Sequence, residues 1–100
     1  MLGIAVRFDV LDEQAGEEFD RLTEVAVARI REREPGTLTY ATHRVKDEPL
    51  ARLFYEVYVD EAAWQTHEAG SHVKEFHAAK DVLLSRPARV EFLHLAPQGS

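Results

Sequence analysis

The sequence contains no cysteine among its 100 residues. Disulfides, thiolate catalysis, iron–sulfur clusters and zinc ribbons are therefore excluded. No apolar run approaches the roughly 20 residues that a membrane-spanning helix requires. The opening segment MLGIAVRFDV also lacks the basic region and the longer apolar region of a secretion signal. We therefore expect a cytoplasmic protein without a membrane partner.

Basic residues are also few, since 12 Lys and Arg stand against 18 Asp and Glu and give a net charge of −6 at pH 7. Binding to nucleic acid depends on neutralising phosphates with Lys and Arg, so we expect no nucleic-acid partner. A composition of 45% hydrophobic and 30% charged residues is typical of a globular protein. The length suits a single domain, which we place at residues 1–96, followed by a frayed tail at residues 97–100.

The first half of the chain alternates between strand and helix patterns. Residues 3–10 alternate in polarity with the period of a strand, and residues 13–34 carry an apolar stripe with the period of a helix. Asp12 is suited to cap this helix, and Pro35-Gly36 is suited to end it. Two strands at residues 37–45 and 50–59 follow, joined by a polar turn that contains Asp47 and Pro49.

The second half has two helical segments and one further strand. Asp60 is suited to cap a short helix that ends at Gly70, and Ser71 to cap a second helix at residues 72–85. Residues 88–96 alternate again and predict the last strand. The order β-α-β-β-α-β predicts an α+β fold of the ferredoxin-like type, an antiparallel sheet with helices on one face.

The face of the sheet without helices is also expected to be apolar. Strand residues 53, 55, 57 and 59 are all apolar or aromatic, and the last strand is apolar on both sides. An uncovered apolar face usually marks an interface. We therefore expect a homodimer that forms sheet against sheet.

Several local motifs together resemble the antibiotic biosynthesis monooxygenase (ABM) domain family. They are Glu34-Pro35-Gly36, Tyr55-Glu56, Asp60-Glu61, and His67 followed five residues later by His72, with Phe76 beyond. The resemblance covers Leu2 to about Leu95. It implies a dimeric α/β barrel with a cavity between sheet and helices in each subunit. It also implies oxidation of quinols, anthrones and related polyketides by dioxygen without flavin, haem or metal; relatives perform isomerisation or haem degradation.

A cluster of three histidines could indicate a metal site, but their spacing of five residues does not suit one. They are His67, His72 and His77. Residues that share a helix face are three or four apart, and His77 lies about 140° around the helix from His72. His72 falls on the apolar stripe beside Phe76. It is either a buried histidine with a hydrogen-bond partner or a group that exchanges a proton with a ligand. We expect no metal and no cofactor.

Other candidates have both a structural and a functional interpretation. Trp64 either packs at the rim of the core or stacks on a flat aromatic substrate. Tyr40 occupies the position of a recurrent tyrosine of the resembled family, where its hydroxyl would bind a substrate oxygen. Glu56 lies between aromatic residues, so it either pairs with an arginine or acts as a base with a raised pKa. The arginines within reach are Arg7, Arg44 and Arg89.

The resemblance departs from the haem-degrading branch of the family. His77 falls where that branch has its helix histidine. The first strand, however, offers Arg7 in place of asparagine, and the tenth residue before His77 is His67 rather than tryptophan. Haem degradation is therefore disfavoured.

Our leading hypothesis is a cofactor-independent monooxygenase that oxidises a small aromatic hydroxyl compound with dioxygen. His72 or His67 would be the base and Tyr40 would bind the oxyanion, while the substrate would also contact Trp64, Phe76, Glu56 and His77. An isomerase of a phosphorylated metabolite would instead need Lys74 or Lys80 in the cavity. A non-catalytic binding module would have a collapsed cavity, or His67 and His72 directed to solvent.

Overall fold

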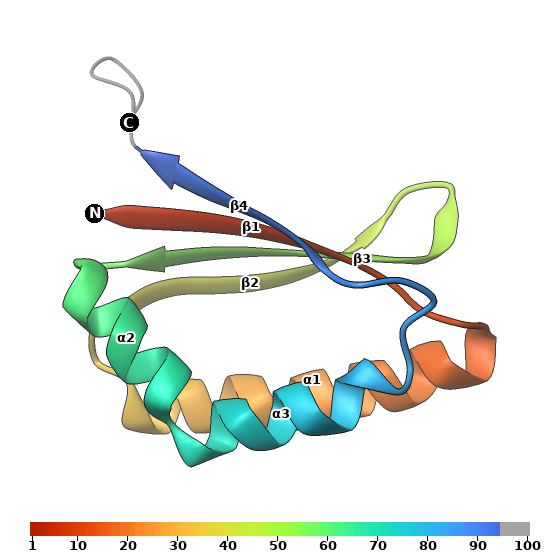
Figure 1. The fold of residues 1–100 in the computed structure, drawn as a ribbon, viewed down its shortest axis with the longest axis horizontal. Coiled ribbons are helices and arrows are strands. Elements are labelled where there is room, and N and C mark those ends of the chain that lie inside the picture. The colour runs from red at the N-terminus through yellow and green to blue at the C-terminus, as the bar shows by residue number, and fades with distance from the viewer. Residues whose placement is uncertain (95–100) are drawn as a thin grey trace.

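The computed structural model describes residues 1–94, which form a four-stranded antiparallel sheet with three helices on one face (Figure 1). The strand order β2-β3-β1-β4 confirms the ferredoxin-like prediction. The end of the last predicted strand and the predicted tail lie outside the described residues. The elements are β1 (Leu2–Asp9), α1 (Glu13–Arg33), β2 (Thr37–Val45), β3 (Glu48–Tyr58), α2 (Glu61–Ala69), α3 (Ser71–Asp81) and β4 (Arg89–His94).

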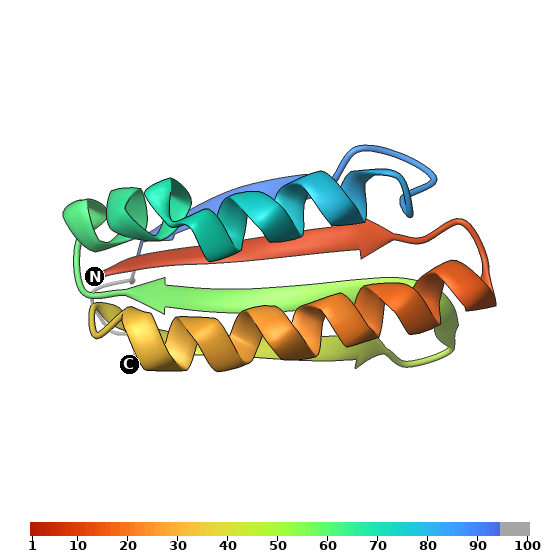
Figure 2. The ribbon, with the colours of Figure 1, turned by 90° about the horizontal axis from the view of Figure 1, so that it is seen from below.

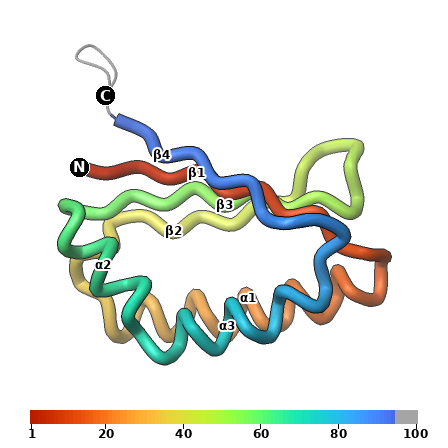
Figure 3. The backbone as a smooth tube through the Cα atoms, in the orientation of Figure 1, coloured from red at the N-terminus to blue at the C-terminus, as the bar shows by residue number. Residues whose placement is uncertain are grey.

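The helices form one layer and the sheet forms the other. Helices α1 and α3 lie side by side, with α1 along β2 and β3 and α3 along β1 and β4 (Figure 2). The tube in Figure 3 shows that α2 carries the chain from the end of β3 down to the helix layer. None of the helices in residues 1–94 has the length and apolarity needed to span a membrane.

Four phenylalanines fill the centre between the two layers. The ring centroids of Phe8 and Phe54 are 4.7 Å apart, those of Phe8 and Phe19 are 5.1 Å apart, and those of Phe19 and Phe76 are 5.9 Å apart. Tilted and edge-on contacts at these distances are favourable beyond the area that they bury. This cluster fixes the helix layer on the sheet and supports the residues that surround the cavity described below.

Side-chain caps and one close contact set the ends of the first two helices. Asp12 accepts a hydrogen bond from the backbone N–H of Ala15 at 2.8 Å, and Asp60 accepts one from Ala63 at 2.8 Å, so both predicted caps are confirmed. After α1 the chain turns at Gly36, where a Cβ would lie 2.7 Å from the Cβ of Ala63. Glycine at this position therefore allows the turn to pack directly against α2.

Several boundaries differ from the sequence prediction, and the largest differences lie around α3 and the hairpin. Gly70, not Ser71, is the N-cap of α3, and no side chain caps that helix. The helix also ends at Asp81 rather than at residue 85, because Leu84 pairs with Val10 in an isolated bridge. The hairpin turn consists of Lys46 and Asp47 alone. Asp47 has a φ of 65°, which a short polar side chain tolerates, and Pro49 lies within the first residues of β3.

The face of the sheet opposite the helices is uncovered and carries several exposed apolar side chains. Tyr55 pairs with Ala5 across β3 and β1, and Leu53 and Leu93 lie on the same face. Leu53 and Tyr55 are 38% and 44% exposed. Val90 and Phe92, in contrast, pair with Val6 and Ile4 and therefore face the helices.

Candidate functional site

A cavity of about 350 Å³ lies between the sheet and helices α2 and α3. Six of the seven residues predicted for the site border it: Tyr40, Glu56, Trp64, His67, Phe76 and His77. Most of the other bordering residues are apolar. They are Ile4, Val6, Phe8, Ala88, Val90 and Phe92, together with the polar Glu68 and Lys80.

Strand register brings Glu56 and Tyr40 to one end of this cavity. Glu56 pairs with Ile4 on one side and with Tyr40 on the other. It is buried and accepts a hydrogen bond from the Tyr58 hydroxyl at 2.6 Å. Burial raises the pKa of Glu56 to about 7, although the Tyr58 hydrogen bond opposes the rise.

The predicted pairing of Glu56 with an arginine is wrong. Each candidate arginine is paired elsewhere: Arg7 with Asp9 and Glu48, Arg44 with Asp20, and Arg89 with Glu91. Arg7 and Arg89 lie on the uncovered face of the sheet, since they alternate with Val6 and Val90 along their strands. Glu56 thus lies in the cavity without a cationic partner among residues 1–94.

Tyr40 presents a neutral hydroxyl at the same end of the cavity. Its ring lies between Phe54, at a centroid distance of 5.8 Å, and His67, at 5.7 Å. Burial, reinforced by the negative charge of Glu56, holds the pKa of Tyr40 well above its ordinary value. The hydroxyl has no hydrogen-bond partner among residues 1–94. It is therefore available to donate to a ligand oxygen.

His67 is held by Glu34, the residue at the C-terminal end of α1. Its Nδ1–H donates to Glu34 Oε1 at 2.7 Å, and both side chains are buried. The Thr37 hydroxyl donates to the same oxygen at 2.7 Å. Because Nδ1 carries the proton that Glu34 accepts, the second ring nitrogen, Nε2, keeps a free lone pair. The side chain borders the cavity, so His67 has the arrangement of an oriented base.

The pKa values of this pair favour the charge state that a base requires. Burial opposes ionisation of Glu34, but hydrogen bonds from Thr37 and His72 and the influence of His67 outweigh it, so the pKa of Glu34 is lowered. Burial also lowers the pKa of His67, against the opposing effect of Glu34. At neutral pH, Glu34 is therefore ionised and His67 is neutral.

His72 does not border the central cavity, contrary to the expectation that it faces a ligand. Its Nε2–H donates to Glu34 Oε2, on the opposite side of the carboxylate from His67. Its ring lines a separate groove of about 190 Å³ between α1 and α3. The geometry matches the structural interpretation of His72, a buried histidine with a hydrogen-bond partner. Gly70 explains the position, since a Cβ there would lie 2.6 Å from His72 Cε1.

Trp64 and His77 border the cavity from α2 and α3. Trp64 packs edge-on against Phe92, with ring centroids 5.3 Å apart. His77 Nε2 lies 3.4 Å from Glu68 Oε2, and this contact lowers the pKa of Glu68. The side chains of Trp64, Glu68 and His77 are partly exposed, so they lie nearer to solvent than the buried His67 does. Among residues 1–94, no set of three or more His, Cys, Asp or Glu side chains is arranged to hold a metal ion.

Two residues contribute to the site beyond those of the leading hypothesis. Sequence reasoning did not assign Glu34 to the site, and it considered Lys80 only for the isomerase hypothesis. Glu34 carried one detectable signal: a carboxylate at the C-terminal end of a helix is unfavourable for the helix dipole, which suggests another purpose. Lys80 carried a weaker signal, since the residue lies one helical turn beyond Phe76. Lys80 is buried and borders the cavity at its other end.

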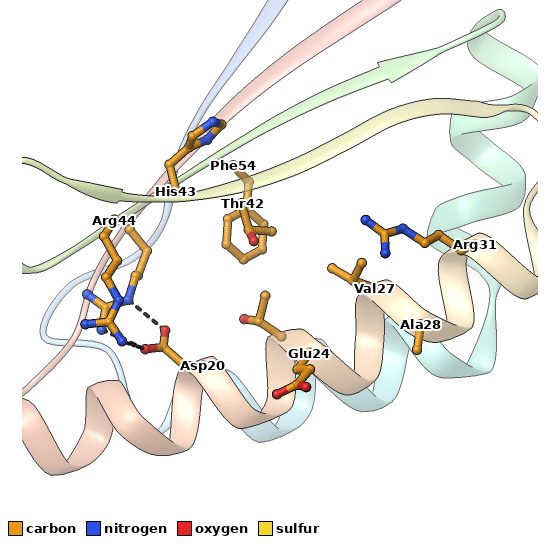
Figure 4. A pocket seen from close by; sticks show the side chains of 11 residues that line it. Asp20, Glu24, Val27, Ala28, Arg31, Thr42, His43, Arg44 and Phe54 are labelled. Carbon is orange, nitrogen blue, oxygen red and sulfur yellow. Dashed lines mark hydrogen bonds and ion pairs between the residues drawn. The ribbon is translucent and has the colours of Figure 1, made fainter.

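A larger open groove of about 590 Å³ lies between α1 and β2 (Figure 4). None of the predicted site residues borders it. Asp20 at its edge accepts hydrogen bonds from Arg44 at 2.6 Å and from Arg52 at 2.7 Å. Arg52 also donates to the backbone oxygens of Pro49 and Ala51. The charged groups at this end therefore satisfy one another, and the central cavity remains the better candidate.

Comparison with known proteins agrees with the fold and the resemblance. A crystal structure described as an antibiotic biosynthesis monooxygenase is 22% identical, with a TM-score of 0.89 over 97% of this chain and 100% of that chain. A Mycobacterium tuberculosis protein is 22% identical, with a TM-score of 0.88 over 99% and 98%. A conserved protein from Methanosarcina mazei Go1 is 17% identical, with a TM-score of 0.86 over 93% and 90%.

These structural likenesses establish the fold, and the sequence itself establishes the family. A comparison with curated proteins finds no match. The family model for antibiotic biosynthesis monooxygenase, in contrast, matches residues 1–79, which is most of the chain. The chain therefore belongs to the antibiotic biosynthesis monooxygenase family.

Proposed function

We propose that this protein is a cofactor-independent monooxygenase that oxidises a small aromatic hydroxyl compound with dioxygen. Quinols, anthrones and polyketide intermediates are the compounds of this kind that the family resemblance suggests. One observation carries the proposal: a basic imidazole nitrogen, oriented by a buried carboxylate, borders an apolar cavity. Family membership supports the same class of reaction.

Proton removal is the first step that these residues support. His67 Nε2 accepts the proton of the substrate hydroxyl, and the Glu34 carboxylate stabilises the imidazolium through its hydrogen bond to Nδ1. The Tyr40 hydroxyl donates a hydrogen bond to the oxyanion that develops. The apolar walls exclude water, which strengthens both interactions.

The anion then has the electrons to reduce dioxygen without a protein cofactor. For an anthrone, which loses the hydroxyl proton of its enol form, a carbon–oxygen bond forms between the ring carbon and dioxygen. The peroxide anion takes back the proton from His67 and becomes a hydroperoxide. The oxygen–oxygen bond then breaks with loss of water, which leaves a quinone carbonyl. One oxygen atom enters the product and the other leaves in water, so the substrate is oxidised by the dioxygen alone.

Oxygen consumption tests this proposal directly. Purified protein is supplied with a panel of quinols and anthrones in an oxygen electrode, with and without a metal chelator. We expect uptake above the uncatalysed rate for at least one compound, and we expect the chelator to leave that rate unchanged. A wild-type protein that consumes no oxygen with any compound of the panel would refute the proposal.

A second candidate function is proton-shuttling isomerisation of a phosphorylated metabolite. Lys80 favours it, because this function requires a cation in the cavity and Lys80 borders it. Glu56 and Glu68 border the same cavity and would repel a doubly charged phosphate. Exchange of a substrate C–H for deuterium under nitrogen, measured by NMR with sugar phosphates, would support isomerisation. The same exchange is not expected of the monooxygenase.

The third hypothesis, a non-catalytic binding module, lacks its expected features. It requires a cavity collapsed around Phe76 and Trp64, or two histidines directed to solvent. The cavity instead retains about 350 Å³, and His67 and His72 are both buried. These observations favour a catalytic use of the cavity.

We also propose that two copies of the chain associate through the uncovered face of the sheet. The exposed apolar side chains of Leu53, Tyr55 and Leu93 support this arrangement. Their burial in an interface would remove this exposed apolar surface from water.

A further inference from the structure

Lys80 places a cation at one end of a cavity whose walls are mostly apolar. Its side chain is only 7% exposed, and Nζ lies 5.6 Å from the centre of the Phe8 ring. The ammonium donates to Asp81 Oδ1 at 2.7 Å, and the Asp81 side chain is 68% exposed. That bond uses one of three N–H donors. The other two N–H donors have no hydrogen-bond partner among residues 1–94, so a ligand that accepts from them would offset part of the cost of burying the charge.

The register of the sheet places Lys80 far from the proposed base. Glu56 lies opposite Ile4, at the end of the cavity that also contains Tyr40 and His67. Lys80 lies over Phe8, four residues further along β1. Four strand residues span about 13 Å. The cavity therefore has a hydroxyl-binding end and a cationic end, with apolar residues between them.

We propose that the substrate is an elongated, flat aromatic compound with a hydroxyl at one end and a carboxylate at the other. The hydroxyl would lie at His67 and Tyr40, and the carboxylate would bind the Lys80 ammonium. This inference rests on the proposed function in taking the central cavity as the substrate site. It adds to that function the position of a negative charge on the substrate, and it makes Lys80 a residue that determines specificity.

A singly charged carboxylate suits the surroundings of Lys80 better than a phosphate does. The ammonium already donates a hydrogen bond to one carboxylate, that of Asp81, at 2.7 Å. Glu68 also borders the cavity, and its negative charge would oppose a second charge on the ligand. In the apolar cavity a charge-assisted hydrogen bond is stronger than in water. A neutral compound of the same shape could not form this hydrogen bond.

Calorimetric titration under nitrogen tests the inference without requiring turnover. The probes are 6-hydroxy-2-naphthoate and 2-naphthol, which differ only in the carboxylate at the far end of the ring system. We expect the wild-type protein to bind the hydroxynaphthoate at least about tenfold more tightly. Lys80→Met keeps the length of the side chain but removes the charge, so it should abolish this preference and leave 2-naphthol binding unchanged.

Two further variants complete the test. Lys80→Arg retains the cation and should retain the preference, and Lys74→Met removes an exposed cation of the same helix and should change neither affinity. Equal affinity of the wild type for both probes, a preference that survives in Lys80→Met, or no binding of either probe would overturn the inference. A protein that shows the preference but consumes no oxygen would refute the oxidation and leave the inference standing.

Discussion

At the scale of single residues, Glu34 is the group on which the site depends. Its carboxylate accepts hydrogen bonds from Thr37, His67 and His72, which come from three different parts of the chain. A buried carboxylate with several donors is favourable, but the donors are left unsatisfied when it is removed. Glu34 therefore both stabilises the fold and orients the proposed base.

Glu34→Gln should lower the free energy of unfolding at pH 7 by about 3 kcal/mol, because an amide cannot accept from both imidazoles as a carboxylate does. Since the pKa of Glu34 is lowered in the folded state, its contribution is present above the ordinary pKa of 4.5 and is lost as the pH falls further. Urea denaturation at pH 7 and pH 4 measures both effects. Thr37→Val, which removes a single donor, should cost only about 1 kcal/mol. Equal stability of Glu34→Gln and wild type at pH 7 would contradict this role.

The contribution of Glu56 to the free energy of unfolding should have the opposite dependence on pH. Its pKa rises from 4.5 to about 7 on folding, so its contribution is present below pH 4.5 and is lost as the pH rises through 7. Glu56→Gln can still accept the Tyr58 hydrogen bond and has no charge to bury. Its stability relative to wild type should therefore increase by roughly 3 kcal/mol between pH 4.5 and pH 8. A difference that does not vary over this range, measured by urea denaturation, would show that Glu56 titrates normally.

At the scale of elements, the break between α2 and α3 positions the two histidines on either side of Glu34. Gly70 has φ −66° and ψ 137°, which alanine can adopt without strain. The methyl group would nevertheless collide with the His72 ring, because a Cβ would lie 2.6 Å from Cε1 and 3.0 Å from Nδ1. The glycine is thus required by the close approach of His72 and not by the backbone conformation.

Gly70→Ala should therefore displace His72 from Glu34 and destabilise the protein by about 1–3 kcal/mol. The hydrogen bond between His67 and Glu34 should persist, since it lies on the other side of the carboxylate. Thermal denaturation measures the loss, and the imidazole resonances in NMR spectra report on each histidine separately. Ser71→Ala, at an exposed neighbour without a capping bond, is the matched control. An unchanged His72 resonance in Gly70→Ala would contradict the proposed cause.

The elements that depend on local pattern could be predicted from the sequence, and those that depend on distant contacts could not. Strand β2 and helix α2 have the predicted bounds because alternation, caps and glycine are local signals. Helix α3 ends early because Leu84 pairs with Val10, far away in the sequence. His67 and Glu34 are likewise 33 residues apart, and no periodicity reports their contact. For the same reason, the helical wheel placed His72 on the buried side of its helix but directed it at the sheet, whereas it lies against α1 and Glu34.

At the scale of the whole molecule, one face of the sheet remains without helices (Figure 1). It carries the exposed apolar side chains of Leu53, Tyr55 and Leu93. Dimerisation through this face would leave the cavity untouched, because the cavity lies on the other side of the sheet. Arg7 and Arg89 on the same face are each paired within the chain, with Glu48 and Glu91. The proposed interface therefore combines the exposed apolar side chains of Leu53, Tyr55 and Leu93 with charged groups that already have partners.

Tyr55→Lys should convert the proposed dimer into a monomer, because it places a charge at the centre of that face. Light scattering coupled to size-exclusion chromatography gives the mass directly. Val25→Lys, at an exposed apolar position on α1, should leave the dimer intact. A wild-type protein that is monomeric at micromolar concentration, or a Tyr55→Lys variant that remains dimeric, would refute the sheet-to-sheet association.

The central claim is that His67, oriented by Glu34, removes the substrate proton in the cavity, whereas His72 acts only through Glu34. The most direct measurement is the rate of oxygen consumption at pH 7 by wild type, His67→Ala and His72→Ala with the best compound of the quinol and anthrone panel. We predict that His67→Ala lowers kcat at least about 100-fold and that His72→Ala lowers it much less. A His67→Ala variant that retains the wild-type rate, or a His72→Ala variant that loses more activity than His67→Ala, would contradict the account.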